Sequence, residues 1–157
     1  MAKELDEIFY EALTASEDLT TICGNRIYST CVEVPPTEDD NTPIPYIIIT
    51  DDSYQNDLGT KDWVWEGCVD HTQASVIISA HSPAEVKRLR RMVRKAIADY
   101  VESMTSNIPY LTSATNEGIN WDWMKPCYYD SLHYQCDMDV DLSDDDDEQE
   151  DEQPAES

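Results

Sequence analysis

Basic residues are scarce in this chain. Only 10 Lys and Arg residues stand against 34 Asp and Glu residues, so the 157 residues carry a formal net charge of −24. Twelve of the acids lie between Asp137 and Glu156, where no Lys or Arg occurs. Because proteins that bind DNA or RNA neutralise phosphates with Lys and Arg, this chain is poorly suited to sequence-specific nucleic-acid binding.

Glycine and long apolar runs are also scarce. The 4 glycines form neither G-x-G-x-x-G nor G-x-x-x-x-G-K, which excludes the known phosphate-cradling loops. The longest wholly apolar runs, such as residues 46–49, are far shorter than the roughly 18 residues of a membrane span. The first residues lack the basic stretch and apolar run of a secretory signal. We therefore expect a protein that is made and stays inside the cell, without a membrane segment.

The patterns that mark metal and catalytic centres are missing as well. The 5 cysteines are odd in number and include no C-x-x-C pair, so neither a full disulfide framework nor a zinc ribbon fits. His71, His81 and His133 lack the spacing that directs two imidazoles at one ion. No G-x-S-x-G elbow occurs, and Ser75 near Asp70-His71 has no oxyanion-donor signal. We expect no enzyme, no cofactor and no metal, and we expect most cysteines to be small buried apolar residues.

One acidic stretch partly matches a calcium-binding loop. Asp137, Asp139, Asp141 and Glu148 occupy positions 1, 3, 5 and 12 of that template. Position 6, which needs glycine for a sharp turn, is Leu142. Apolar and polar residues alternate without a fault from Leu132 to Leu142, which instead predicts a strand with one buried and one solvated face.

Two helices and a short helical turn are expected. Residues 3–15 carry one apolar stripe, made of Leu5, Ile8, Phe9, Ala12 and Leu13. A short turn follows, capped by Ser16 and stopped by Gly24. Ser82-Pro83-Ala84-Glu85 has the form of a capping box and starts a long helix at residues 83–102. Its apolar side comprises Val86, Leu89, Val93, Ala96, Ile97, Tyr100 and Met104, and its opposite side comprises Lys87, Arg88, Arg91, Arg94 and Lys95.

The remaining residues alternate between extended segments and loops. Extended segments are predicted at residues 26–28, 45–50, 61–68, 73–80, 119–123 and 132–142, where 61–80 forms two strands or one bent strand. Exposed loops are predicted at residues 33–45 and 51–60.

This element order predicts an α+β domain. An antiparallel sheet is covered on one side by the N-terminal helix and the long amphipathic helix, and a β-hairpin ends the domain. The domain spans residues 1–142, and the acidic residues 143–157 form a disordered tail because they have nothing apolar to bury.

Two features remain to be explained. The pairs Trp63/Trp65 and Trp121/Trp123 could stack bases or sugars, but core or subunit contacts fit an acidic chain better. The five bases of the long helix could form a solvated face, bind phosphate, pair with acids of the same chain or meet acids of a neighbouring copy. We assign Trp63, Trp65 and these five bases to an inter-subunit interface.

Several motifs together resemble those of the tail-terminator (tail-completion) proteins of long-tailed phages and tailed archaeal viruses. The resemblance covers roughly residues 5–142. This sequence differs from the common pattern of the family in its proline-rich acidic loop at 33–45 and in its acidic end after Leu142. Its carriers are Glu7-Ile8-Phe9-Tyr10-Glu11-Ala12-Leu13, Asp18-Leu19-Thr20-Thr21-Ile22, Gly24-Asn25-Arg26-Ile27-Tyr28, Pro43-Ile44-Pro45-Tyr46-Ile47-Ile48-Ile49, Ala74-Ser75-Val76-Ile77-Ile78-Ser79-Ala80 and Ser82-Pro83-Ala84-Glu85-Val86.

The resemblance implies a structural virion protein rather than an enzyme. Such proteins form a ring, usually of six copies, at the head-proximal end of the tail tube, and they join the tube to head-completion proteins. The resemblance also implies assembly in the host cytoplasm and passage of the genome through the ring without specific binding. Three alternatives stay open: an acidic interaction module such as a DNA mimic or chaperone, a head-completion (stopper) protein of the same connector, and a small enzyme of unknown type.

Overall fold

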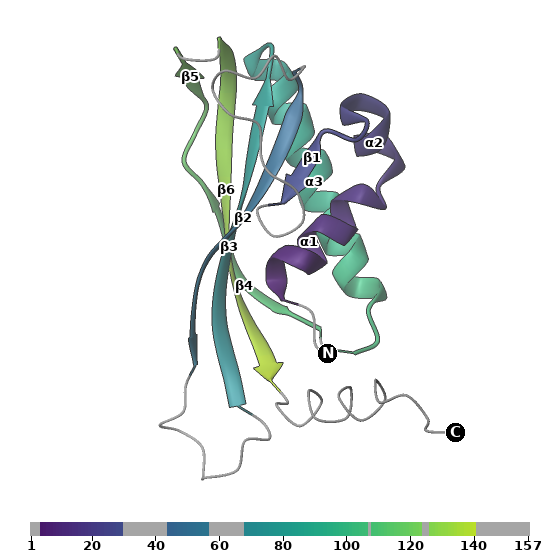
Figure 1. The fold of residues 1–157 in the computed structure, drawn as a ribbon, viewed down its shortest axis with the longest axis vertical. Helices are drawn as coiled ribbons and strands as arrows, with labels where there is room; N and C mark the ends of the chain where they lie inside the picture. Colours follow the sequence, from purple (N-terminus) through teal and green to yellow (C-terminus); the bar gives the residue numbers. More distant parts are fainter. Residues whose placement is uncertain (1–3, 30–43, 57–67, 107, 124–125, 141–157) are drawn as a thin grey trace, which may run out of the picture.

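The computed structural model describes residues 4–29, 44–56, 68–106, 108–123 and 126–140, and the statements below concern these ranges. Along the described chain two helices precede three strands, and a third helix then precedes three more strands (Figure 1). The helices are α1 (Leu5–Thr14), α2 (Glu17–Cys23) and α3 (Pro83–Ser103). The strands are β1 (Ile27–Ser29), β2 (Tyr46–Asn56), β3 (Cys68–Ala80), β4 (Tyr110–Asn116), β5 (Asn120–Asp122) and β6 (Cys127–Val140).

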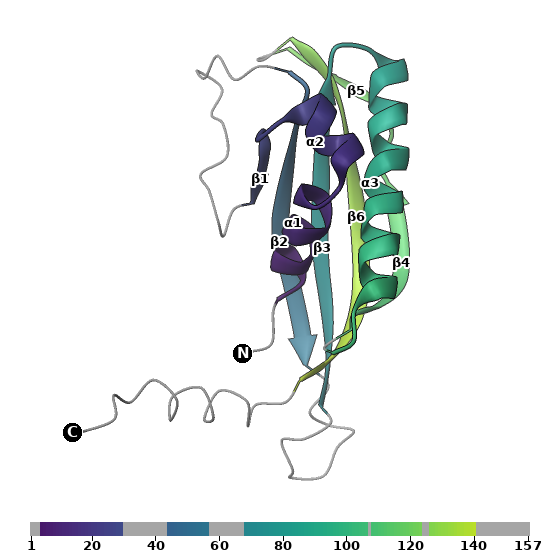
Figure 2. The same ribbon diagram turned by 90° about the vertical axis from the view of Figure 1, so that its right-hand side faces the viewer.

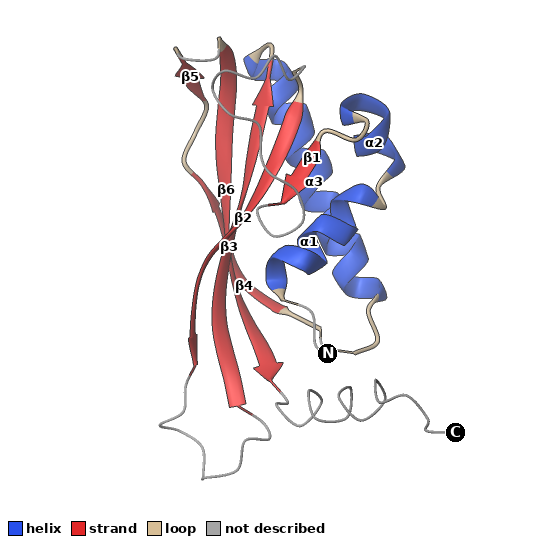
Figure 3. Ribbon diagram, viewed as in Figure 1, coloured by secondary structure: helices blue, strands red, loops and turns tan. Residues whose placement is uncertain are grey.

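All six strands belong to one sheet, and the helices cover one face of it. The strand order is β1-β2-β3-β6-β4, with β5 also paired to β6 (Figure 3). The perpendicular view shows α1 and α2 beside α3 in a single helical layer (Figure 2). In that layer α1 contacts β1, β2 and β3, whereas α3 contacts β3 and β6. The predicted α+β class with helices on one side is therefore confirmed.

The sheet is mixed, which corrects the expectation of an antiparallel one. β1 pairs with β2 in parallel, with Ile27 opposite Ile47, and every other pair in the described sheet is antiparallel. Parallel neighbours need a long connection, whereas antiparallel ones can be joined by a tight turn. Residues 30–45 provide a connection of that length between β1 and β2.

β2 runs further than its sequence suggests. The predicted loop at residues 51–60 is wrong for residues 51–56, because these continue β2 and pair with β3. A register shift between Asp51 and Ser53 interrupts the ladder there. Backbone hydrogen bonds to β3 hold this polar stretch extended, and strand propensity does not report such pairing. The expected strand at 61–68 and the expected loop at 33–45 fall mostly outside the described residues.

The helix termini follow the predicted capping residues with one difference. The Ser16 hydroxyl accepts from the Leu19 amide at 3.4 Å, and Gly24 ends α2 with a φ of +60°. The Ser82 hydroxyl accepts from the Glu85 amide at 3.2 Å, as predicted. The Glu85 carboxylate, however, accepts from the amide of His81 at 3.3 Å and not from Ser82, so the capping box is displaced by one residue.

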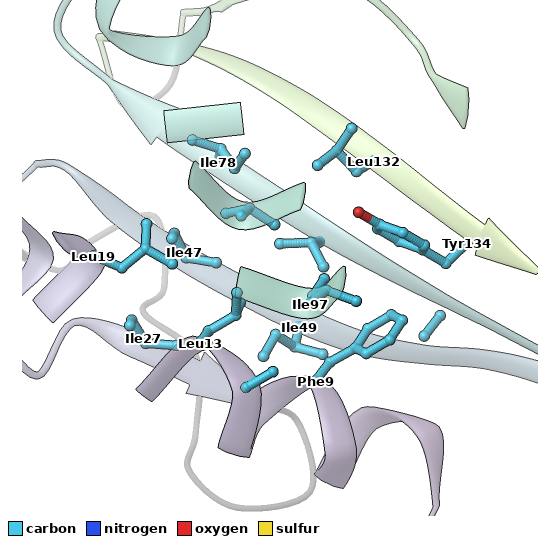
Figure 4. Close-up of a cluster of buried hydrophobic side chains, with 14 of the residues drawn as sticks. Phe9, Leu13, Leu19, Ile27, Ile47, Ile49, Ile78, Ile97, Leu132 and Tyr134 are labelled. Carbon is cyan, nitrogen blue, oxygen red and sulfur yellow. The ribbon is translucent and has the colours of Figure 1, made fainter. Parts of the chain in front are cut away.

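The core fills the space between the sheet and the helices (Figure 4). The complete predicted stripe of α1 is buried, and the edge of Phe9 meets the ring of Tyr134 with 4.9 Å between centroids. Val86, Leu89, Val93 and Ile97 of α3 are fully buried, as are the side chains of Ile47 and Ile49. The predicted alternation in β6 is confirmed by the burial of Leu132, Tyr134, Cys136 and Met138. Among the described helices, none combines the length and the apolar character needed to cross a bilayer.

The domain ends in the expected hairpin. β5 pairs with the start of β6, with Trp121 opposite Tyr128. β4 pairs with the middle of the same strand, with Ala114 opposite Tyr134. Residues 141–157 lie outside the described ranges, so the disordered acidic tail stays a prediction.

Candidate assembly surfaces

The outer side of α3 presents a row of cations, here called the basic face. All five side chains are exposed, and they lie opposite the buried residues that pack on the sheet. The sequence therefore placed them correctly. The members of the basic face are Lys87, Arg88, Arg91, Arg94 and Lys95.

The basic face is electrostatically unbalanced within the described part of the chain. Arg91 stands four residues from Lys87 and from Lys95, and three from Arg88 and from Arg94. Like charges at these spacings are neighbours on a helix, and each pair destabilises it by about 0.2 to 0.5 kcal/mol. Among the described residues no acid forms an ion pair with these five cations. The face is therefore available to acids from outside the monomer.

A sixth base of α3, Arg90, turns inward instead. Its Nη1 donates to the Asp130 Oδ2 of β6 at 2.7 Å. The Asp130 side chain is fully buried and also accepts from Asn116 Nδ2 at 3.1 Å and from the Gly118 amide at 3.0 Å. This carboxylate thus ties α3 to β6, to the end of β4 and to the turn before β5. It fixes the orientation of α3 and so the direction in which the basic face points.

Sequence reasoning missed this network, although one signal was present. Asp130 has the same parity in β6 as Leu132, Tyr134 and Cys136, so the alternation places it on the core side. A charged residue on that side needs a counter-charge. The sequence pattern does not say which base supplies it.

The sheet face away from the helices carries a polar network across four segments. The Ser75 hydroxyl of β3 donates to an Asp52 carboxylate oxygen of β2. On its other side Ser75 Oγ lies 2.7 Å from Nδ1 of His133, whose Nε2 lies 3.0 Å from Glu117 Oε1. Further along the same face, His71 Nδ1 lies 2.5 Å from Asp137 Oδ1, its direct cross-strand partner. Such pairs stabilise neighbouring strands against one another.

The Ser75, His133 and Glu117 contacts have the connectivity of a nucleophile, a base and an orienting acid. The local geometry does not support that chemistry. Ser75 stands opposite Thr50 and His133 in the middle of the sheet, where its backbone belongs to the strand ladder rather than to an oxyanion hole. Its hydroxyl proton is directed to Asp52 rather than to the imidazole. We assign this set a role in strand pairing.

An exposed aromatic cluster lies at the β5–β6 hairpin. Trp123 is 85% exposed and Trp121 is 37% exposed. The ring of Trp121 stands edge-on to Trp123 at 6.0 Å and to Tyr128 at 4.8 Å. The expectation of core use is therefore wrong for Trp123, while subunit contact stays a prediction. Trp63 and Trp65, which the sequence predicts to lie in the inter-subunit interface together with the basic face, lie outside the described residues.

Three cysteines are buried in the described part of the chain. Cys23, Cys127 and Cys136 fit the prediction of small apolar core residues. Burial raises the pKa of Cys23 from 9.0 to about 11 and that of Cys136 to about 12. Such thiols stay protonated and poorly nucleophilic near neutral pH.

Comparison with known proteins gives little further information. No protein-family model matches the chain, and no curated protein matches it. One chain of a solved structure, described as the virion of a native gene transfer agent particle, aligns with 87% of this chain and 95% of its own length. The two share 16% sequence identity and a TM-score of 0.46. A likeness at this level establishes neither a shared fold nor a shared function.

Proposed function

We propose that this protein forms a ring, with six copies, at the head-proximal end of a viral tail tube. There it ends polymerisation of the tube and joins the tail to head-completion proteins. Support comes from the elements that carry the resemblance, which recur in the expected order: α1, α2 leading into β1, then β2, β3 passing directly into α3, and a final hairpin.

The observation that carries the proposal is the exposed basic face of α3. Its five cations are half of the 10 bases in a chain of net charge −24. Copies of such a chain repel one another unless opposite charges meet at their contacts. A basic face placed against the acids of a neighbour relieves that repulsion and fixes the orientation of the copies.

Acids suitable for this contact are exposed on α2 and near the C-terminal end of α3. Glu17 and Asp18 are exposed on α2, and Asp99 and Glu102 are exposed near the end of α3. A single exposed pair contributes only about 0.2 to 1 kcal/mol, so several pairs must act together. The apolar area that a stable ring also needs is offered by Trp121 and Trp123, since tryptophan is enriched at the centres of interfaces.

The test reverses the charge of two central residues of the basic face. In the double variant Arg91→Glu and Arg94→Glu, the fraction of rings measured by mass photometry should fall while helix content by circular dichroism stays that of the parent. The loss should be larger at low salt, because salt screens exposed charges. Unchanged rings at low and moderate salt would exclude the charge model.

A control separates the basic face from net charge. Arg91→Gln with Arg94→Gln removes two positive charges from the face, whereas Thr21→Glu with Asn25→Glu adds two negative charges at exposed positions near α2. Both pairs change the net charge by the same amount. Only the first should reduce ring formation.

The same measurement distinguishes the alternatives. Rings that bind purified tail-tube protein support a terminator, and rings that bind only the head connector indicate a stopper protein. A chain that stays monomeric with and without tube protein indicates an acidic interaction module such as a DNA mimic or chaperone. Electron microscopy of tubes incubated with the protein shows directly whether their ends are capped.

A further inference from the structure

Asp6 is a buried carboxylate that has no hydrogen-bond partner among the described residues. It lies in the first turn of α1, and its side chain is fully buried. Neither Oδ1 nor Oδ2 of Asp6 has a hydrogen-bond partner in the described structure. An isolated buried carboxylate is strongly unfavourable unless it binds a proton, a base or a cation.

Two further carboxylates lie against Asp6. One oxygen from each of Glu4, Asp6 and Asp51 can be chosen so that all three atoms lie within 4.8 Å of one another. Glu4 is the N-cap residue of α1 and forms a reciprocal capping box with Glu7. Asp51 comes from β2, so the cluster joins two elements that are distant in sequence.

Regular strand alternation explains why Asp51 points to this side, because Asp51 has the same parity in β2 as the buried Ile47 and Ile49. Asp51 pairs with Ala74, whose side chain is buried in the core beneath the helices. The next residue, Asp52, faces the opposite side of the sheet, where it holds Ser75. The strand therefore directs two adjacent carboxylates to opposite faces, and only Asp51 meets the N-terminus of α1.

The cluster is unfavourable when its members are ionised without a cation. Burial raises the pKa of Asp51, and the nearby carboxylates of Asp6 and Asp52 raise it further. The charges that face Asp51 in the described structure are thus negative.

We propose that Glu4, Asp6 and Asp51 together bind one hard divalent cation, Ca²⁺ or Mg²⁺, which ties the start of α1 to β2. Carboxylate oxygens are the ligands that these ions prefer, and the cluster contains neither the imidazole nor the thiolate that favours zinc. Two oxygens on opposite sides of Ca²⁺, each about 2.4 Å away, are separated by about 4.8 Å, so the observed spread fits a single ion. Glu4 and Asp51 are exposed, so water can reach the ion and complete its coordination.

The competing explanation is a proton on Asp6, and the two explanations differ in their response to metal and to pH. The full-length protein is first treated with chelator, and its Tm is then measured with increasing CaCl2 or MgCl2 at constant ionic strength. A bound ion should raise the Tm at pH 7 by about 3 to 6 °C when its concentration reaches ten times its Kd. Comparison of the two salts shows which ion the site prefers.

Variants assign the response to the site. Asp6→Asn and Asp51→Asn should each abolish the metal-dependent rise, and Asp51→Asn changes an exposed residue, so the variant should stay folded. Asp52→Asn is the matched control, since it removes the adjacent carboxylate from the other face of β2 and should keep the full response. Calcium that binds weakly to the acidic residues after Asp137 affects all four proteins alike, so it cancels in the comparison.

Three outcomes would overturn the proposal. First, the Tm of the parent could stay unchanged up to 10 mM of either salt, a concentration on the order of ten times the Kd of weak calcium sites. If the Tm of the same protein also rises on acidification to pH 5, the carboxylate of Asp6 binds a proton rather than a metal ion. Asp6→Asn could respond to metal as the parent does, which places the ion elsewhere. Asp52→Asn could lose the response together with Asp51→Asn, which indicates a diffuse effect of charge. In isothermal titration calorimetry, Asp6→Asn should show one metal-binding site fewer than the parent.

Discussion

The guanidinium of Arg90 and the carboxylate of Asp130 form a buried ion pair, with 2.7 Å between Nη1 and Oδ2. Asp130 is fully buried and the Arg90 side chain is 25% exposed. The pair joins residues that are 40 positions apart and fastens α3 to the β4–β5–β6 part of the sheet. Arg90 thus stabilises the monomer, whereas the five cations of the basic face on the same helix point outward.

Replacing Arg90 by Met should therefore destabilise the monomer. Asp130 would keep its bonds from Asn116 and Gly118 but lose its counter-charge. Breaking one side of a buried pair typically lowers the free energy of unfolding by about 3 to 5 kcal/mol. Urea denaturation measures the change, and Arg88→Met, at an exposed position, should stay within about 0.5 kcal/mol of the parent. Equal stabilities of the two variants would contradict a structural role for the pair.

Val93→Asp should also be strongly destabilising. Val93 is fully buried where α3 packs on the sheet, so the variant places an unpaired charge in the core. We expect a loss of several kcal/mol, measured by thermal or urea denaturation. Ala98→Asp introduces the same side chain at an exposed position of α3 and should have little effect. If Val93→Asp melts like the parent, the packing of α3 is wrong.

Stability should decrease at alkaline pH. Burial raises the pKa of Cys136 and of Tyr134 to about 12, from 9.0 and 10.0 respectively. Each group is neutral when protonated, so its contribution is complete below its unfolded pKa and is lost as the pH rises toward the folded value. For Cys136 the loss should be on the order of 2 kcal/mol by pH 11.

Thermal denaturation between pH 8 and pH 11 measures this decrease. Cys136→Ala should flatten the part of the pH profile that begins near pH 9, because only the unfolded parent releases that proton readily. A Tm of the parent that does not change up to pH 11 would be inconsistent with the burial of these groups.

Deleting residues 143–157 should leave the domain folded. All the described core residues precede Val140, and the deleted segment contains nine acids and no large apolar residue. Far-UV circular dichroism and Tm should match those of the parent, and a large loss of secondary structure would refute the proposed domain boundary. A full-length variant with every Asp and Glu of this segment changed to Asn and Gln separates the effect of charge from that of length.

Local sequence patterns were sufficient for most of the secondary structure. The apolar stripe of residues 5–13, the capping serines and the alternation from Leu132 to Met138 each report the conformation of neighbouring residues. Side chains repeat about every 3.6 residues in a helix and every 2 in a strand, so a short window shows both the element and its buried face. The same periodicity placed all five cations of the basic face in solvent.

Contacts between distant residues could not be read in this way. The parallel pairing of β1, the continuation of β2 beyond Thr50 and the meeting of Asp6 with Asp51 all depend on which segments become neighbours. The sequence by itself determined that the alternating residues from Leu132 to Met138 face the core and that the long helix is rich in bases. Only the tertiary structure decided that Arg90 neutralises Asp130 while Asp6 has no hydrogen-bond partner among the described residues, because a local pattern specifies a direction and not the charge that lies across the core.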